Sequence, residues 1–249
     1  MGMTRPNSFR WSISVMPNKK PSKPFFSRLA QWHIWLGWLV GIPIVMWTAT
    51  GLFMVAKPIS EVRGNHLRLP MAEGPLIIEE GPLATNGEQF REMRVIMQDG
   101  RAVLILTTLD DISTRVDFAS GSVLPRLDAA AARALVARRI VGGGNVRSVR
   151  FFEADEVPFD FRRPLPVWQV ALEDGAHIYV GRDTGEIEAV RTSWWRWFDF
   201  MWGLHIMDIS EREDTSHPIL IAFAAMSLIG TLFGCILMFR RRKSRVKTA

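Results

Sequence analysis

Five histidines are the side chains of this sequence best suited to chemistry, and four of them lie next to long apolar stretches. His33 directly precedes the first stretch and His66 follows it by ten residues, while two more precede the second stretch, His205 and His217. An unpaired polar group is costly near a bilayer, so an imidazole there is favoured when it ligates a metal or lies among lipid headgroups. Both interpretations remain open. The fifth, His177, lies in a segment typical of a surface strand.

The two apolar stretches have the length of membrane-spanning helices. Ile34–Ala56 and Pro218–Phe239 contain 23 and 22 residues without a charge. A bilayer core of about 30 Å needs about 20 helical residues to cross it. We therefore expect transmembrane helices over residues 28–57 and 217–240, surrounded by a lipid bilayer. The first stretch is longer than the apolar core of a secretion signal and no cleavage site follows it, so we expect an uncleaved anchor.

The distribution of charge predicts the orientation of these helices. Residues 1–33 and 240–249 each hold six basic residues and no acidic residue, so the two tails contribute +12. The whole chain carries +6, so residues 57–217 carry a net charge of −6. Basic flanks stay in the cytoplasm during insertion. Both termini are therefore expected inside and the central domain outside. The tails explain the basic pI, and no nucleic-acid-binding motif is visible.

The single cysteine limits the chemistry further. Cys235 lies inside the second apolar stretch, so the chain can form no internal disulfide and no cysteine-based metal site.

The central domain contains an internal repeat. Residues 103–124 align without gaps on residues 167–188, at an offset of 64. Both copies predict a strand, a tight turn, a second strand, a turn and a short strand. In the second copy Asp174-Gly175 is typical of a hairpin turn, and Gly185 can supply a positive φ in the next turn.

The residues before the second copy predict a helix and a further strand. Alanine-rich residues 127–139 favour a helix that begins near Asp128, Gly142 to Gly144 end it, and residues 146–152 predict the strand. Residues 126–190 resemble a PepSY domain, a small extracytoplasmic α+β module. Residues 76–125 resemble a degenerate partner without a clear leading helix.

Short motifs beside the apolar stretches extend the resemblance. They are Trp32-His33-x-Trp35-Leu36-Gly37, Thr50-Gly51-Leu52 and Leu204-His205. Over residues 28–243 the chain resembles the PepSY-associated transmembrane family. That family is linked to b-type haem held by membrane histidines and to the reduction of iron–siderophore complexes. His33 and His205 match the family's histidines, and His66 matches a subgroup pattern, Arg63-Gly64-Asn65-His66-Leu67. The subgroup pattern continues in Leu204-His205-Ile206-Met207-Asp208.

The resemblance implies haem iron held by His205 and His66, with His217 on the same side. One outer haem could then form within a chain or across a dimer. His33 is about 20 helical residues away, roughly 30 Å, so it would need an inner haem shared with a second chain. No flavin reductase module is fused, so the electron donor would be a separate protein. Better-known siderophore-reducing relatives have four spans, and this chain has two.

The aromatic residues before the second span predict an interfacial helix over 193–212. On a helix one face would carry Trp194, Phe198, Met201, His205 and Asp208. This face would lie at the membrane surface, line a haem pocket, or do both. Two small-xxx-small patterns, Gly37/Gly41 and Gly230/Gly234, favour close helix approach, either within the chain or between the chains of a homodimer.

The sequence therefore predicts an α+β chain in a bacterial inner membrane, with two spans that flank tandem PepSY-like units. The expected segments are a disordered basic cytoplasmic tail over 1–27, spans over 28–57 and 217–240, periplasmic units over 58–125 and 126–192, the interfacial helix over 193–212, and a basic tail over 241–249. The favoured function is haem-dependent electron transfer to an acceptor such as a ferric siderophore. The alternative is a non-enzymatic module that binds a peptidase or a ligand through the PepSY unit.

Overall fold

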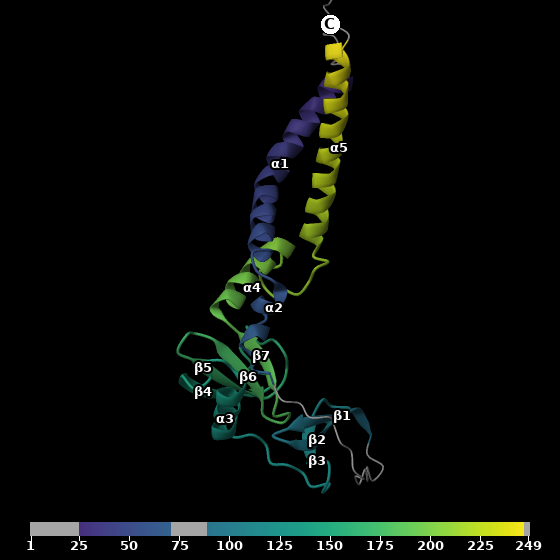
Figure 1. The fold of residues 1–249 in the computed structure, drawn as a ribbon. Coiled ribbons are helices and arrows are strands. Elements are labelled where there is room, and N and C mark those ends of the chain that lie inside the picture. Colours follow the sequence, from purple (N-terminus) through teal and green to yellow (C-terminus); the bar gives the residue numbers. More distant parts are fainter. Residues whose placement is uncertain (1–24, 71–88, 247–249) are drawn as a thin grey trace, which may run out of the picture. The chain divides into compact units, whose positions relative to one another are not determined.

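The structure is a computed structural model that describes residues 25–70 and 89–246, with side chains as far as residue 239. It is an α+β chain with two long helices and, between them in the sequence, antiparallel sheets (Figure 1). The chain divides into two compact units. The helical unit runs up to Ile44 and resumes at Ile221, and the domain unit runs from Val45 to Leu220. The predicted tail residues 1–24 and 247–249, and residues 71–88 of the predicted unit 58–125, lie outside the described residues.

The long helices are α1, Phe25–Met54, and α5, Pro218–Val246. Within the described residues they are the two helices long and apolar enough to cross a membrane, and only 11% of the most apolar window of each is buried. A core helix of a soluble protein would be mostly buried. Helix α1 is shifted relative to the predicted span 28–57, because it begins within the expected tail 1–27 and ends at Met54, whereas α5 is longer than predicted and continues into 241–249. Arg and Lys have high helix propensity and are favourable at a helix C-terminus, which explains the extension of α5.

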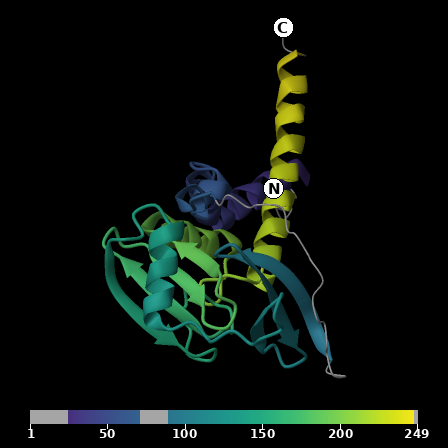
Figure 2. The ribbon, with the colours of Figure 1, turned by 60° about the horizontal axis from the view of Figure 1, so that its bottom comes forward.

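A four-stranded meander forms the larger sheet, with strand order β4-β5-β6-β7. Its strands are β4 (Val146–Phe152), β5 (Val167–Leu172), β6 (His177–Gly181) and β7 (Ile187–Arg191). Helix α3, Ala129–Arg139, crosses one face of this sheet (Figure 2). Apolar residues of α3 such as Val136 pack on Val170 and Ile178 of the sheet. Asp128 caps α3, since its Oδ1 accepts from the N–H of Ala131 at 2.7 Å, so the predicted helix and its start are confirmed.

The smaller sheet confirms the repeat at the level of strand register. It comprises β1 (Phe90–Gln98), β2 (Arg101–Thr108) and β3 (Ser113–Asp117). Val103 lies opposite Asp117, and Val167 lies opposite Gly181, so both members of the pair are displaced by the predicted offset of 64. The first copy has only an isolated bridge where the second has β7. Pro125 follows that bridge and has no N–H with which to continue the ladder.

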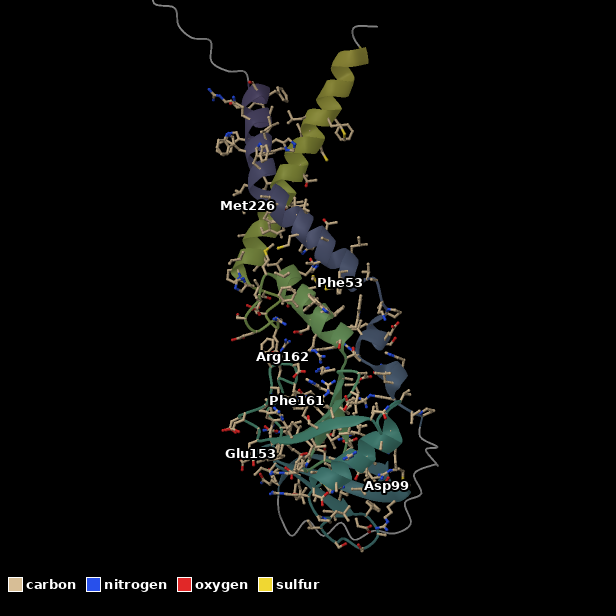
Figure 3. The ribbon with its side chains drawn as sticks, turned by 90° about the vertical axis from the view of Figure 1, so that its left-hand side faces the viewer. Phe53, Asp99, Glu153, Phe161, Arg162 and Met226 are labelled. Atoms are coloured by element: carbon tan, nitrogen blue, oxygen red, sulfur yellow. The ribbon has the colours of Figure 1, made fainter. Side chains whose placement is uncertain are left out.

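The second face of the larger sheet is covered by the loop between β4 and β5. Phe161 of this loop (labelled in Figure 3) stacks on Tyr179 at 4.7 Å between ring centroids. The Tyr179 hydroxyl donates to Asp160 at 2.5 Å, and His177 lies 3.2 Å from the same carboxylate. Burial alone would raise the pKa of Asp160, but these two hydrogen bonds outweigh it and the pKa lies below its usual value. Asp160 is therefore a largely buried, hydrogen-bonded carboxylate, with 16% of its side chain exposed.

Two short helical segments lead from α1 into the domain: α2, Ile59–Val62, and η1, Asn65–Leu67. Gly64 between them has φ +72°, and a Cβ at this position would lie 2.5 Å from Cγ1 of Val190. Only glycine fits, because both the backbone conformation and the contact with β7 exclude a side chain.

We expect Gly64→Ala to destabilise the domain by about 2–4 kcal/mol, because positive φ and an overpacked contact each cost about 1–3 kcal/mol. Gly100→Ala is the matched control, since Gly100 also has positive φ but has open space around it. It should cost about 1 kcal/mol. Thermal unfolding of the purified chain would measure both. Equal losses in the two variants would contradict the packing role of Gly64.

Candidate functional site

The site is built on α4, Ser193–Ile206, and on the last ten residues of α1, Val45–Met54, which belong to the same unit. Thr192 caps α4 by accepting from the N–H of Trp195 at 3.0 Å. The helix ends where Met207 adopts a left-handed conformation, φ 59°. The predicted aromatic helix is therefore present. Asp208 lies beyond its end, so the prediction that Asp208 shares a helical face with His205 is wrong.

One face of α4 packs on the end of α1. Trp194 stacks on Phe53 (labelled in Figure 3), with ring centroids 4.8 Å apart and planes at 15°. Three turns later His205 stacks on Trp47 at 4.7 Å and 13°. The two positions are eleven residues apart and share a helical face. Two stacked ring pairs thus fix both ends of α4 against α1.

A threonine of α1 defines the tautomer of His205. Thr50 Oγ1 lies 3.0 Å from the carbonyl oxygens of Met46 and Trp47, and 3.0 Å from Nδ1 of His205. The hydroxyl has one proton, which it donates to a carbonyl, so it accepts a hydrogen bond from Nδ1–H. A neutral imidazole protonated at Nδ1 keeps its lone pair on Nε2. His205 is therefore oriented as a second hydrogen bond orients a metal-ligating histidine.

The surroundings of His205 favour its neutral form. Burial lowers the pKa of His205, and the carbonyl of Trp47 offsets this only in part. Gly51 leaves room for the ring, since a Cβ there would lie 3.3 Å from Cε1 of His205. The Thr50-Gly51 motif thus has two local roles, a hydrogen-bond acceptor and a space for the imidazole.

The other outer histidines lie in different surroundings. His66 is exposed on η1, and the adjacent Leu67 packs on the core of the larger sheet. His217 directly precedes α5; its Nδ1 is buried and has no hydrogen-bond partner within the described residues. In that same part of the chain no hydrogen bond or ring contact joins either of them to His205. Ligation of one iron by His205 and His66 stays a prediction.

His33 lies in the helical unit, where α1 and α5 run antiparallel. Its Nδ1 donates to the carbonyl oxygen of Gly230 at 3.0 Å, which leaves Nε2 with the lone pair. A Cβ at Gly234 would lie 2.9 Å from the His33 ring. Gly230 and Gly234 therefore receive an imidazole of the same chain. A Cβ at Gly37 or Gly41 would meet none of the described atoms within 4 Å. The homodimer through these glycines stays a prediction.

A buried carboxylate fixes the opposite side of α4. Asp199, with 7% of its side chain exposed, accepts from Arg162 and from Arg212 at 2.6 Å each. Both guanidinium groups also lie over the ring of Phe159, at 4.4 and 4.9 Å. Arg162 is labelled in Figure 3 beside the loop that carries Phe161. One carboxylate therefore joins α4 to the loop before β5 and to the loop that follows α4.

Asp208 organises the chain that leaves α4. Its carboxylate accepts hydrogen bonds from Ser210 Oγ and from the N–H groups of Glu211, Glu213 and Asp214. Burial alone would raise the pKa of Asp208, but the four donors outweigh it and the pKa lies well below its usual value. The role of Asp208 is thus structural.

Chelation of a metal ion by clustered side chains has no support in the described ranges, since no group of three His, Cys, Asp or Glu side chains could hold one there. A haem iron differs, because the porphyrin supplies four ligands and the protein one or two.

Comparisons with protein-family models, with curated proteins and with solved structures find no match. The PepSY-associated transmembrane resemblance therefore stays a prediction.

Proposed function

We propose that the protein is an inner-membrane electron carrier that binds b-type haem through His205. The observation that carries the proposal is the hydrogen bond between Thr50 and His205, which anchors Nδ1–H and directs the lone pair to Nε2. Haem, when bound, would supply one-electron redox chemistry. Thr50 holds the ligand's tautomer, Trp47 fixes the plane of its ring, and Gly51 leaves it space.

A second residue to hold the haem iron would come from the same outer side. We favour His217 within the chain, because its ring is partly buried and its Nδ1 lacks a partner among the described residues. His66 is the other candidate, and a second chain is the third source. His33 has its own anchored Nδ1 and would serve an inner haem.

The membrane placement is part of the same proposal. Both termini would lie in the cytoplasm and the sheets in the periplasm, as the basic tails predict. Trp197 and Phe200 of α4 are 58% and 37% exposed, which suits rings at the headgroup level. Electrons would come from a separate flavin reductase and pass to a periplasmic acceptor such as a ferric siderophore.

A visible absorption spectrum tests the proposal. The full chain would be expressed with ample haem, solubilised in detergent and measured before and after reduction with dithionite. We expect a Soret band and, after reduction, the sharp α and β bands of a low-spin b-type haem, with haem content measured as the pyridine complex. A colourless protein under these conditions would refute haem binding. Reoxidation of the reduced protein by a ferric siderophore would then test the acceptor.

A further inference from the structure

A cleft of about 410 Å³ lies between α3, the turn that joins β1 to β2, and strand β3. Four arginines line it: Arg115, Arg126, Arg138 and Arg139. Asp99 (labelled in Figure 3) and Asp128 are the acidic residues among its lining. The cleft therefore has a surplus of positive charge, within a segment whose overall charge is negative.

Two of these arginines already have carboxylate partners. Arg138 donates to Asp99 at 3.1 Å, and Arg126 lies 3.0 Å from Asp183. The carboxylate of Asp128 is engaged as the cap of α3. The acidic groups around the cleft are thus committed to other partners.

The remaining two guanidinium groups have no such partner. Arg115 donates to Oε1 of Gln98 at 3.2 Å and to the carbonyl oxygen of Pro125 at 2.5 Å, both neutral acceptors. Arg115 is half-buried, and this burial lowers the pKa of its guanidinium group. No carboxylate in the described part of the chain pairs with Arg139. Within the described residues Arg115 and Arg139 therefore form no ion pair, although Asp183 and Asp99 are near enough to favour the charge of Arg115.

Arg115 is also held in place. Gly185 has φ +67°, and a Cβ there would lie 2.8 Å from Nη1 of Arg115, so glycine makes room for the guanidinium. Gln98 is in turn fixed, since its Nε2 donates to the carbonyl oxygen of Thr184 at 2.8 Å. An arginine whose position is set before binding loses little entropy when it meets an anion.

We propose that this cleft binds a small anionic ligand that carries carboxylate or phosphate groups. Arg115 and Arg139 are its charge-bearing contacts, because guanidinium groups pair with oxyanions in a fork geometry. The volume lies within the range of small-molecule sites. The proposal is independent of haem, so the two can fail separately.

Calorimetric titration of the full chain in detergent tests the cleft, with citrate and inorganic phosphate as probes in separate arms. We expect saturable binding of at least one probe at one site per chain. Arg139→Gln and Arg115→Gln should each weaken it at least tenfold, as expected for loss of a charged hydrogen bond. Arg139→Gln is the decisive variant, because Arg115 is also packed between the sheets. The haem spectrum, measured on the same samples, should not change.

Arg133→Gln is the matched control, since it removes the same charge from the same helix. Arg133 does not line the cleft. It should bind like the unaltered chain. Two results would overturn the proposal. One is the absence of saturable binding of both probes to the unaltered chain. The other is an equal loss of affinity in the Arg133 and Arg139 variants, which would indicate a general charge effect.

Discussion

His205→Ala protein should lack the Soret band that we expect of the unaltered chain. The substitution removes the Nε2 lone pair that Thr50 directs, so a haem without a covalent bond to the protein would lose one of the residues that hold its iron. Haem content per chain, measured on protein purified from haem-replete cells, is the readout. His177→Ala is the control, because His177 belongs to the sheet and pairs with Asp160. Equal haem content in the two variants would contradict ligation by His205.

The anchor of His205 can be tested apart from the ligand itself. Thr50→Val removes the acceptor for Nδ1–H but preserves the shape, and loss of such a partner lowers affinity about 10–100-fold in metal sites. Thr50→Ser keeps the hydroxyl and should retain haem. His217→Ala and His66→Ala would then identify the second ligand, since only the true ligand should change the low-spin bands.

Asp199→Asn should destabilise the domain unit by about 3 kcal/mol, since breaking a buried ion pair by removing one partner costs about 3–5 kcal/mol. The change leaves Arg162 and Arg212, each with 18% of its side chain exposed, without their shared carboxylate. We place the effect at the lower end because the two arginines keep some contact with water. Thermal unfolding followed by tryptophan fluorescence would measure it.

Glu173→Gln is the matched control for Asp199. Glu173 pairs with Arg147, but both side chains are about 60% exposed, at 61% and 59%. Exposed pairs contribute about 0–1 kcal/mol, so the midpoint of unfolding should hardly move. If the Asp199 variant lost no more stability than the Glu173 variant, the two arginines would have found other partners or water.

Much of the secondary structure could be predicted because it depends on local signals. The apolar stretches, the alanine-rich segment before the second copy and the turn residues Asp174-Gly175 each act over a few residues. The gapless repeat predicted two equivalent hairpins, and their strands pair in the same register, because turn geometry and side-chain alternation determine how strands pair. Helix ends were less well predicted, since α1 and α5 continue beyond their apolar stretches.

The partners of individual side chains could not be predicted in this way. Asp160 lies in a loop between two strands, yet its carboxylate is held by Tyr179 and His177, which lie on β6. Nothing local indicated that Asp199 would receive two arginines, because both come from other segments of the chain. Nor did anything local indicate that Arg115 would be half-buried beside Gly185. Burial of a charge depends on what the fold brings over it.

His205 shows most clearly which properties depend on local sequence and which depend on tertiary contacts. The sequence alone determined that a histidine follows an aromatic helical segment close to a membrane-spanning stretch, because composition and periodicity are local properties. The tertiary structure decided that its Nδ1 meets Thr50, 155 residues away along the chain, and that its ring stacks on Trp47. A tautomer is set by the partner of one nitrogen atom, and that partner exists only once α1 and α4 have packed together.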